Sequence, residues 1–348
     1  MVNFMGNKRL CFLDILKGIG IILVIIGHSH VQSRAGDLIY SFHMPLFFFL
    51  SGILFDAKKD KHVVDLLKRR LFTIIVPYII FYIFLLLFQT YIEVPLYDYK
   101  YVNFTHQLVG LFYGSPYKDF MLFNAIWFLP TLISVEVVYY AVQKRVKLSW
   151  LKIFIIFMLF GVGCFLGKRG LSLLPWGMTQ ALVVLPFYML GHYLHPVIQK
   201  CANSEFAFLC NYREKVSRYI APFFFAVLFI VLYIFLPTDM DIKSAYISPL
   251  ISGVLVAFAG VLFMVSVSIW IRNCSWIEFI GRNTLIIIPI HQPLLRLYDF
   301  GFHSVSIGRD FALRYSTIYP WVIALLALLS CLPFIFLWRN IYMRRIYH

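Results

Sequence analysis

An apolar run near the start of the chain, FLDILKGIGIILVIIGHSH, is interrupted by the ionisable residues Asp14, Lys17 and His28 and ends at a further histidine, His30. On a helix, Lys17 and His28 are three turns apart to within about 20°, and Asp14 lies about 40° to the other side of His28. All three side chains therefore share one face, with a rise of ~16 Å between Lys17 and His28. Histidine is the usual general base near neutral pH. The spacing predicts a functional polar stripe that ends at His28, a residue type suited to accept a proton, with a cation near the other end of the helix.

Lys17 and Asp14 also allow a purely structural interpretation. A lysine near a helix end extends to the membrane interface and pairs with a nearby carboxylate. Both interpretations stay open for this pair. The placement of all three residues on one face favours a functional stripe that includes His28.

Other ionisable residues also fall in apolar segments. His43 opens the second apolar run, at the membrane level of His28, and is expected either to serve the site or to be an ordinary interfacial residue. His291 lies deep in a late apolar run, where an unpaired imidazole is costly, so we expect a site role rather than a structural one. Glu136 is equally deep in another run and needs a partner. We expect it to join two helices rather than to react.

The elements that position these residues must lie in a membrane. Of 348 residues, 61% are hydrophobic and only 14% are charged, which excludes a soluble enzyme, a disordered chain and a disulfide-stapled module. The net charge of +15 is explained by basic cytoplasmic loops, so we expect membrane lipids and no nucleic acid as partners. The six cysteines are scattered without metal-ligand spacing, so no metal site is expected.

The apolar runs predict an all-α transmembrane bundle of about ten spans, forming a single domain over residues 1–348. Lys and Arg are concentrated in alternate loops, above all in the loop from Asp56 to Arg70, so both termini are expected in the cytoplasm. The predicted spans are Leu10–His28, Ile39–Phe55, Leu71–Ile92, Met121–Val142, Leu151–Leu166, Trp176–Leu194, Tyr219–Leu236, Pro249–Ile271, Thr284–Tyr298 and Ile318–Trp338.

Two segments carry a resemblance to a known family. Lys17 and His28 fit the Arg/Lys-x10-His pattern of the acyltransferase-3 family of multi-span acyltransferases, and SFHMPLFFFLSG, around His43, is similar to the second span of those proteins. The run Lys68–Arg70 and the segment GRNT before His291 extend the likeness over the whole chain, which most resembles the fucose 4-O-acetyltransferase-like branch. Many members have Arg at the position of Lys17, and Lys keeps that charge without the bidentate fork.

The resemblance implies acyl transfer, usually of acetyl from acetyl-CoA, to a sugar hydroxyl of a cell-envelope polysaccharide or its lipid-linked precursor. It implies a multi-pass protein of the bacterial inner membrane, with acetyl-CoA as donor and no permanently bound cofactor. His28 would act either as the base or as a covalent acyl carrier, and the acyl group stays open between acetyl, succinyl and longer chains. The catalytic candidates are His28, His43, His291 and Asp14. The coenzyme-binding candidates are Lys17, Lys68, Arg69 and Arg70.

A different class of protein would share some of these features. A transporter or flippase for a glycan or a lipid-linked sugar also places charges inside the membrane. Such a protein has no need of a stripe from a cation to a histidine, together with a cytoplasmic basic cluster. The presence of both Lys17 and His28 also argues against a sensor that keeps the fold without the chemistry.

Overall fold

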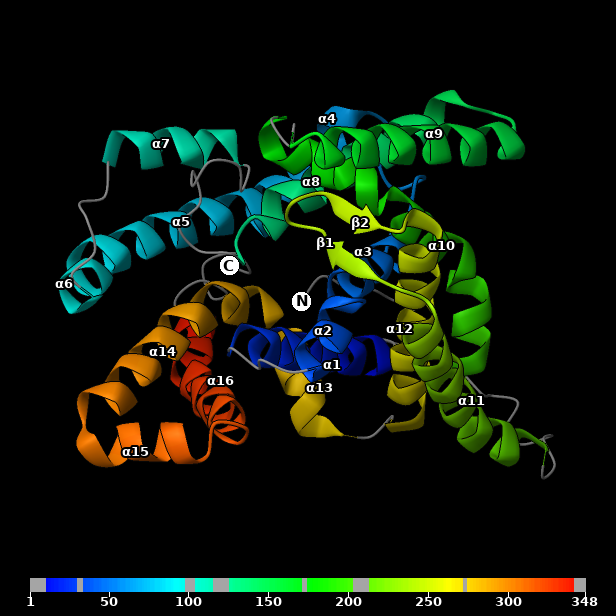
Figure 1. The fold of residues 1–348 in the computed structure, drawn as a ribbon. Coiled ribbons are helices and arrows are strands. Elements are labelled where there is room, and N and C mark those ends of the chain that lie inside the picture. The colour runs from blue at the N-terminus through cyan, green and yellow to red at the C-terminus, as the bar shows by residue number, and fades with distance from the viewer. Residues whose placement is uncertain are drawn as a thin grey trace. The chain divides into compact units, whose positions relative to one another are not determined.

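The described part of the chain is almost entirely helical. The computed structural model describes residues 11–29, 34–97, 104–114, 125–170, 174–202, 213–271 and 274–340. Figure 1 shows the helices in chain order, with one two-stranded antiparallel ribbon among them. The chain divides into two compact units, each built from separate stretches of sequence. The first gathers Met1–His43, Pro196–Val231 and Ala259–His348, and the second gathers Met44–His195 and Leu232–Phe258.

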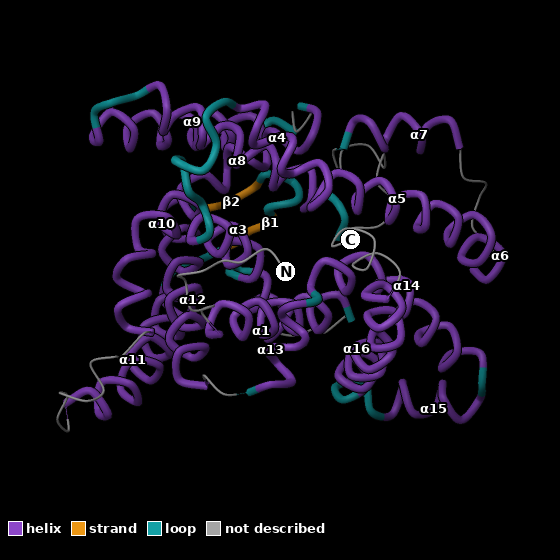
Figure 2. The backbone as a smooth tube through the Cα atoms, turned by 180° about the vertical axis from the view of Figure 1, so that it is seen from behind, coloured by secondary structure: helices purple, strands orange, loops and turns teal. Residues whose placement is uncertain are grey.

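The first unit is built around the N-terminal helix. This helix, α1, packs against α2, α13, α14 and α16, and Figure 2 shows α1 beside α13, with α14 and α16 adjoining. Most of α11 and the end of α12 also belong here. The bounds are α1 Cys11–His28, α2 Arg34–Tyr40, α11 Arg213–Phe235, α12 Leu250–Ile271, α13 Ser275–Arg282, α14 Thr284–Ser304, α15 Ser306–Arg314 and α16 Tyr319–Trp338.

Glycines let α1 and α13 cross at close range. A Cβ on Gly18 would overlap the carbonyl oxygen of Ile277, and one on Gly281 would overlap that of Asp14. The two backbones touch because neither position carries a side chain, as in other closely packed membrane helices. This contact brings the first turns of α1 against the end of α13.

The second unit contains most of the remaining helices and the ribbon. Residues Asp239 to Asp241 pair with Tyr246 to Ser248 in its ribbon. The bounds are α3 His43–Ile53, α4 Val63–Arg70, η1 Leu71–Ile75, α5 Val76–Phe88, η2 Gln89–Glu93, α6 Val94–Tyr97, α7 Phe104–Tyr113, α8 Phe128–Arg145, α9 Ser149–Lys168, η4 Pro175–Gly177, α10 Met178–Ala202, β1 Asp239–Asp241 and β2 Tyr246–Ser248.

The segment from α4 to α6 runs without a break but changes its pitch. At its start, the backbone N–H of His62 donates to Asp65 Oδ2 at 2.9 Å, which caps α4. Pro77 has no N–H for the carbonyl of Thr73, and the chain adopts a π turn over Leu71–Ile75. The predicted span Leu71–Ile92 therefore lies inside a longer helix that begins eight residues earlier, at Val63.

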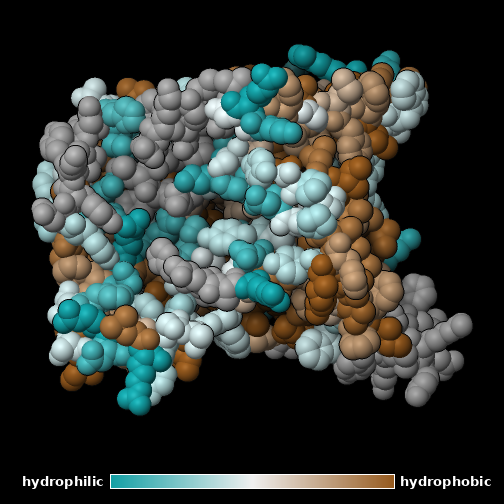
Figure 3. Space-filling view, in the orientation of Figure 1, coloured by the Kyte–Doolittle hydropathy of each residue, from teal (hydrophilic) through white to brown (hydrophobic). Residues whose placement is uncertain are grey.

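Six helices of the described ranges are long and apolar enough to cross a membrane. Apolar side chains such as Ile251 on α12 stand exposed, and Figure 3 shows brown, hydrophobic surface over a large part of the face that it draws. Among the other predicted spans, the run Ile39–Phe55 is divided between α2 and α3 by a turn at Ser41 and Phe42. The six are Cys11–His28, Val63–Tyr97, Ser149–Lys168, Pro175–Cys201, Leu250–Ile271 and Tyr319–Trp338.

Candidate active site

The last residue of α1 meets a second histidine from α14. The ring centroids of His28 and His291 are 5.4 Å apart, with the ring planes at 39°. His28 is partly exposed, whereas His291 is fully buried. The two residues are far apart in sequence, and the packing of α14 on α1 brings them together. The two predicted site histidines therefore belong to one cluster in the first unit.

His291 is buried with one ring nitrogen unsatisfied. Its Nδ1 lies 2.9 Å from the carbonyl oxygen of Ile287, one turn earlier in α14. A carbonyl only accepts, so Nδ1 donates and neutral His291 keeps its lone pair at Nε2. That nitrogen has no hydrogen-bond partner among the described residues, and the side chain is 0% exposed. A buried acceptor of this kind is costly and marks a position where a ligand proton or a water satisfies it.

His43 lies beside the pair, and Tyr40 stands between. The Nδ1 of His43 donates to the carbonyl oxygen of Ile39 at 2.9 Å. His291 has the same arrangement with the carbonyl oxygen one turn earlier in its own helix. Tyr40 packs edge-on against both His43, at 5.0 Å between ring centroids, and His28, at 6.5 Å. The Tyr40 hydroxyl donates to the carbonyl oxygen of Gly27 at 3.1 Å and ties α2 to the end of α1. Tyr40 therefore links His43 to His28.

Gln292 completes this cluster, which consists of His28, Tyr40, His43, His291 and Gln292. The side-chain nitrogen of Gln292 lies 3.3 Å from Nδ1 of His28. Tyr40 and Gln292 were not expected from the sequence. The one sequence signal for them is that each lies next to a polar residue. No group of three or more metal-ligating side chains occurs in the part of the chain that the structure describes.

A second polar cluster occupies the opposite end of α1. The carboxylate of Asp14 is buried and accepts from Lys17 Nζ at 3.5 Å and from Arg282 Nε at 3.3 Å. Arg282 also pairs with Glu278 one turn earlier in α13. The side chains of Lys17 and Arg282 stay 28% and 43% exposed, so both cations still face outward. The pairing of Lys17 with Asp14 is the structural alternative raised by their spacing, and Arg282 is an addition that the sequence did not reveal.

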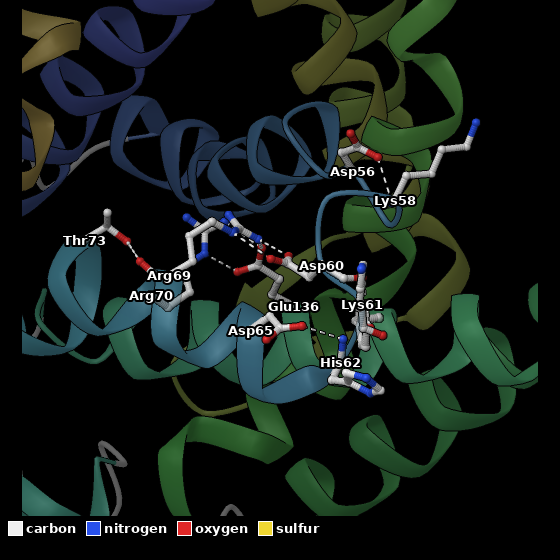
Figure 4. A network of polar contacts seen from close by, with 11 residues as sticks. Asp56, Lys58, Asp60, Lys61, His62, Asp65, Arg69, Arg70, Thr73 and Glu136 are labelled. Carbon is white, nitrogen blue, oxygen red and sulfur yellow. Dashed lines mark hydrogen bonds and ion pairs between the residues drawn. The ribbon is translucent and has the colours of Figure 1, made fainter. Parts of the chain in front are cut away.

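The basic run in the last turn of α4, Lys68–Arg70, forms its own network in the second unit. Arg70 donates two hydrogen bonds to Glu136, from Nε to Oε2 at 2.5 Å and from NH2 to Oε1 at 2.6 Å. Arg69 bonds Asp60 at 2.6 Å and reaches Glu136 at 3.4 Å. Figure 4 shows both guanidinium groups turned toward these carboxylates. Tyr140 donates to the carbonyl oxygen of Lys61 and fastens the loop.

This network bears on two predictions. Glu136, expected to need a partner, has Arg70 and Arg69, and it joins α8 to α4. Arg69 and Arg70, expected to bind coenzyme, have their charges balanced by Glu136 and Asp60, whereas Lys68 is exposed. Each guanidinium has five N–H donors and uses only part of them here. The network therefore holds the two arginines in place, while Glu136 and Asp60 use only some of the N–H donors of each guanidinium.

The chain was compared with known proteins. A search of curated proteins and a search of solved structures both return no match. A family model described as an acyltransferase domain, Acyl_transf_3, matches residues 11–339. That range begins at the first residue of α1. It includes the polar clusters at the two ends of α1 and the Arg70–Glu136 network. Because the match covers nearly the whole chain, the protein belongs to the acyltransferase-3 family of membrane acyltransferases.

Proposed function

We propose that the protein transfers an acetyl group from cytoplasmic acetyl-CoA to a sugar hydroxyl of a cell-envelope polysaccharide or its lipid-linked precursor. The observation that carries the proposal is the apposition of His28 and the fully buried His291 at one end of α1. Paired imidazoles with a lone pair left in a buried site suit the removal of a proton from a hydroxyl. The fucose 4-O-acetyltransferase-like branch is the proposed place within the family.

The transfer needs one base and a polarised thioester. The acceptor oxygen forms a bond to the acetyl carbonyl carbon, its proton moves to an imidazole nitrogen, and the bond from that carbon to the coenzyme sulfur breaks. The proton then passes to the departing thiolate. In the alternative route, a nitrogen of His28 bonds the acetyl carbon, the C–S bond breaks and coenzyme A leaves as the thiol with the ring proton. The acceptor hydroxyl then attacks the acyl-imidazole, the carbon–nitrogen bond breaks, and the hydroxyl proton returns to the ring. In both routes His28 is the reacting group and His291 supplies a second lone pair beside it.

The opposite end of α1 suits the coenzyme. Acetyl-CoA carries several phosphate charges, and Lys17 with Arg282 offers two outward cations held by one buried carboxylate. Asp14 therefore acts by positioning these cations rather than by touching the acetyl group. In the second unit taken by itself, we propose Lys68, Arg69 and Arg70 as donors to coenzyme phosphates, because Glu136 and Asp60 leave part of each arginine unused.

The membrane arrangement follows from the same assignment. We propose about ten spans in the bacterial inner membrane with both termini in the cytoplasm, where the run Ile39–Phe55, α8, α11 and α14 add to the six helices that meet the length and hydropathy criteria. Lys17 then lies near the cytoplasmic side, where acetyl-CoA is found. His28 lies near the outer side, where the envelope glycan is built.

An apolar cavity supports a lipid-linked acceptor. A cavity of about 190 Å³ lies between α1 and α16, lined by Ile22, Ile25, Ile26, Trp321, Ala324, Leu325 and Leu328. Ile26 is within one turn of His28, and Ile22 within two. A hydrocarbon chain in this cavity would hold its head group at the level of the histidines.

The test uses the purified protein in nanodiscs with radiolabelled acetyl-CoA and an extract of envelope glycans and lipid-linked sugars. Transfer of label to a sugar supports the proposal. Transfer of label from succinyl-CoA but not from acetyl-CoA would change the donor while keeping the reaction class. Binding or movement of a lipid-linked sugar, with no transfer of label from any acyl-CoA, would overturn the proposal and leave a transporter as the better account.

A further inference from the structure

The three imidazoles of the cluster are held in two different ways. His43 and His291 each donate from Nδ1 to a carbonyl oxygen one turn earlier in the chain. His28 instead meets a side chain of another helix, with the nitrogen of Gln292 at 3.3 Å from Nδ1. A backbone carbonyl fixes the tautomer of the first two histidines. At Nδ1, His28 faces a carboxamide instead, and a carboxamide can turn about its last bond.

A carboxamide has one end that donates and one that accepts. With its nitrogen toward His28, Gln292 donates to Nδ1, so the neutral ring carries its proton at Nε2. A half turn brings Oε1 to the same place. The oxygen then accepts an N–H from Nδ1, and the lone pair of the ring moves to Nε2. The second form is the one that a base needs, because the oxygen also stabilises the imidazolium formed when Nε2 takes a proton.

We propose that Gln292 is the positioning residue that selects the tautomer of His28, with Oε1 accepting the Nδ1 proton while Nε2 receives the proton of the acceptor hydroxyl. The inference rests on the proposed function, since it takes His28 as the reacting base. In this step the hydroxyl O–H bond breaks, its oxygen bonds the acyl carbon, and the C–S bond of the thioester breaks. The proton on Nε2 is then returned to the coenzyme thiolate, and Gln292 contacts no reacting atom.

Few other titratable groups among the described residues face His28. His291 faces it from α14, and Tyr40 faces it from α2 and joins it to His43. The charged side chains Arg34 and Asp37 of α2 and Arg296 of α14 are exposed. The α16 side chains that line the cavity shared with α1 are apolar, and α13 packs at the Asp14 end of α1. A substitution of Gln292 therefore changes one neighbour of His28 and leaves these other groups the same in every variant.

Two substitutions separate the accepting role from the space that the side chain fills. Gln292→Met keeps the length without a hydrogen bond, and kcat should fall about tenfold to a hundredfold with the KM for acetyl-CoA unchanged. Gln292→Glu offers only acceptors and a negative charge, so it should keep much of kcat at alkaline pH. Its charge favours the imidazolium, and the acid limb of the pH–kcat profile should move to higher pH by about one unit. Ser304→Ala, on an exposed turn of the same helix, serves as the matched control.

The measurement is the pH dependence of kcat and of the KM for acetyl-CoA in nanodiscs, with wild type and His28→Ala in the same series. Acetyl-CoA binding by each variant reports that it is folded, since that binding depends on the opposite end of α1. A loss in Gln292→Met together with the shifted limb in Gln292→Glu supports the inference. If wild type turns over and His28→Ala does not, wild-type behaviour of both Gln292 variants overturns the inference alone. Equal inactivity of both variants also overturns it, because an acceptor would then not suffice. If wild type itself shows no turnover, the proposed function fails first.

Discussion

Arg70 and Glu136 form a two-point ion pair between α4 and α8, with both bonds between 2.5 and 2.6 Å. The carboxylate is only 2% exposed, and the guanidinium side chain is 24% exposed. Removing one partner of such a pair leaves the other charge without compensation, at a cost of about 3 kcal/mol. The pair therefore holds the basic run against α8 before it can serve any ligand.

Glu136→Gln should accordingly lower the stability of the second unit by about 3 kcal/mol. Replacing both partners, as Arg70→Met with Glu136→Leu, should recover much of the loss, because neither charge of this pair is then left without the other and Arg69 keeps Asp60 as its partner. Thermal unfolding in detergent measures both variants. Asp56→Asn, in the exposed part of the same loop, is the control. Unchanged unfolding of Glu136→Gln would show that the pair adds nothing to stability.

Lys17→Ala should weaken acetyl-CoA binding by roughly tenfold to a hundredfold, since a contact between charged groups contributes ~1.5–3 kcal/mol. Lys17→Arg should keep most of the affinity because the charge remains. Arg282→Ala should weaken binding in the same direction, and it also leaves Asp14 with one cation fewer. Calorimetric titration of the nanodisc-bound protein with acetyl-CoA measures all three variants. Wild-type affinity in Lys17→Ala would leave the pairing with Asp14 as its only role.

Gly281→Val should disrupt the crossing of α1 and α13. Even a Cβ at this position would overlap the carbonyl oxygen of Asp14, so the helices must separate. We expect loss of acetyl-CoA binding together with a lower thermal midpoint, because Arg282 moves with α13. Gly301→Val, where a Cβ would meet no atom within 4 Å, is the matched control. Normal binding and stability in Gly281→Val would contradict the close crossing.

Ala324→Phe should fill the cavity between α1 and α16. If the cavity holds the chain of a lipid-linked acceptor, transfer to lipid-linked sugars should fall at least tenfold while acetyl-CoA binding stays normal. Leu329→Phe, on the exposed side of the same helix, is the control. The check is a comparison of transfer rates to lipid-linked and to water-soluble sugar acceptors. Equal rates in Ala324→Phe and wild type would exclude the cavity from acceptor binding.

The sequence predicted the parts of the site that depend on local spacing. The three-residue step from Asp14 to Lys17 predicted their possible pairing, and the depth of Glu136 predicted a partner. The partners that come from distant segments were not predictable from periodicity. Arg282 reaches Asp14 only because glycines let α13 approach α1, and Gln292 reaches His28 only through the packing of α14.

The span count shows the same limit. Apolar runs alone predicted about ten spans, whereas six helices of the described ranges meet both length and hydropathy. The helix α8 carries Glu136 and a basic end, and α14 carries His291, Gln292 and two prolines. The polar side chains that build the clusters lower the hydropathy of the helices that present them. Hydropathy therefore misses α8 and α14, although they supply Glu136, His291 and Gln292, whereas α1, which carries Lys17 and His28, meets the criterion.

The most direct test of the account is acyl transfer by His28→Ala beside wild type at matched protein level. Mass spectrometry of envelope glycans from cells that make each protein, and label transfer from acetyl-CoA in nanodiscs, both report it. The account predicts acetylated sugars with wild type, and in His28→Ala a loss of at least about a hundredfold with acetyl-CoA binding intact. Acetylation at the wild-type rate by His28→Ala would remove His28 from the mechanism and contradict the account.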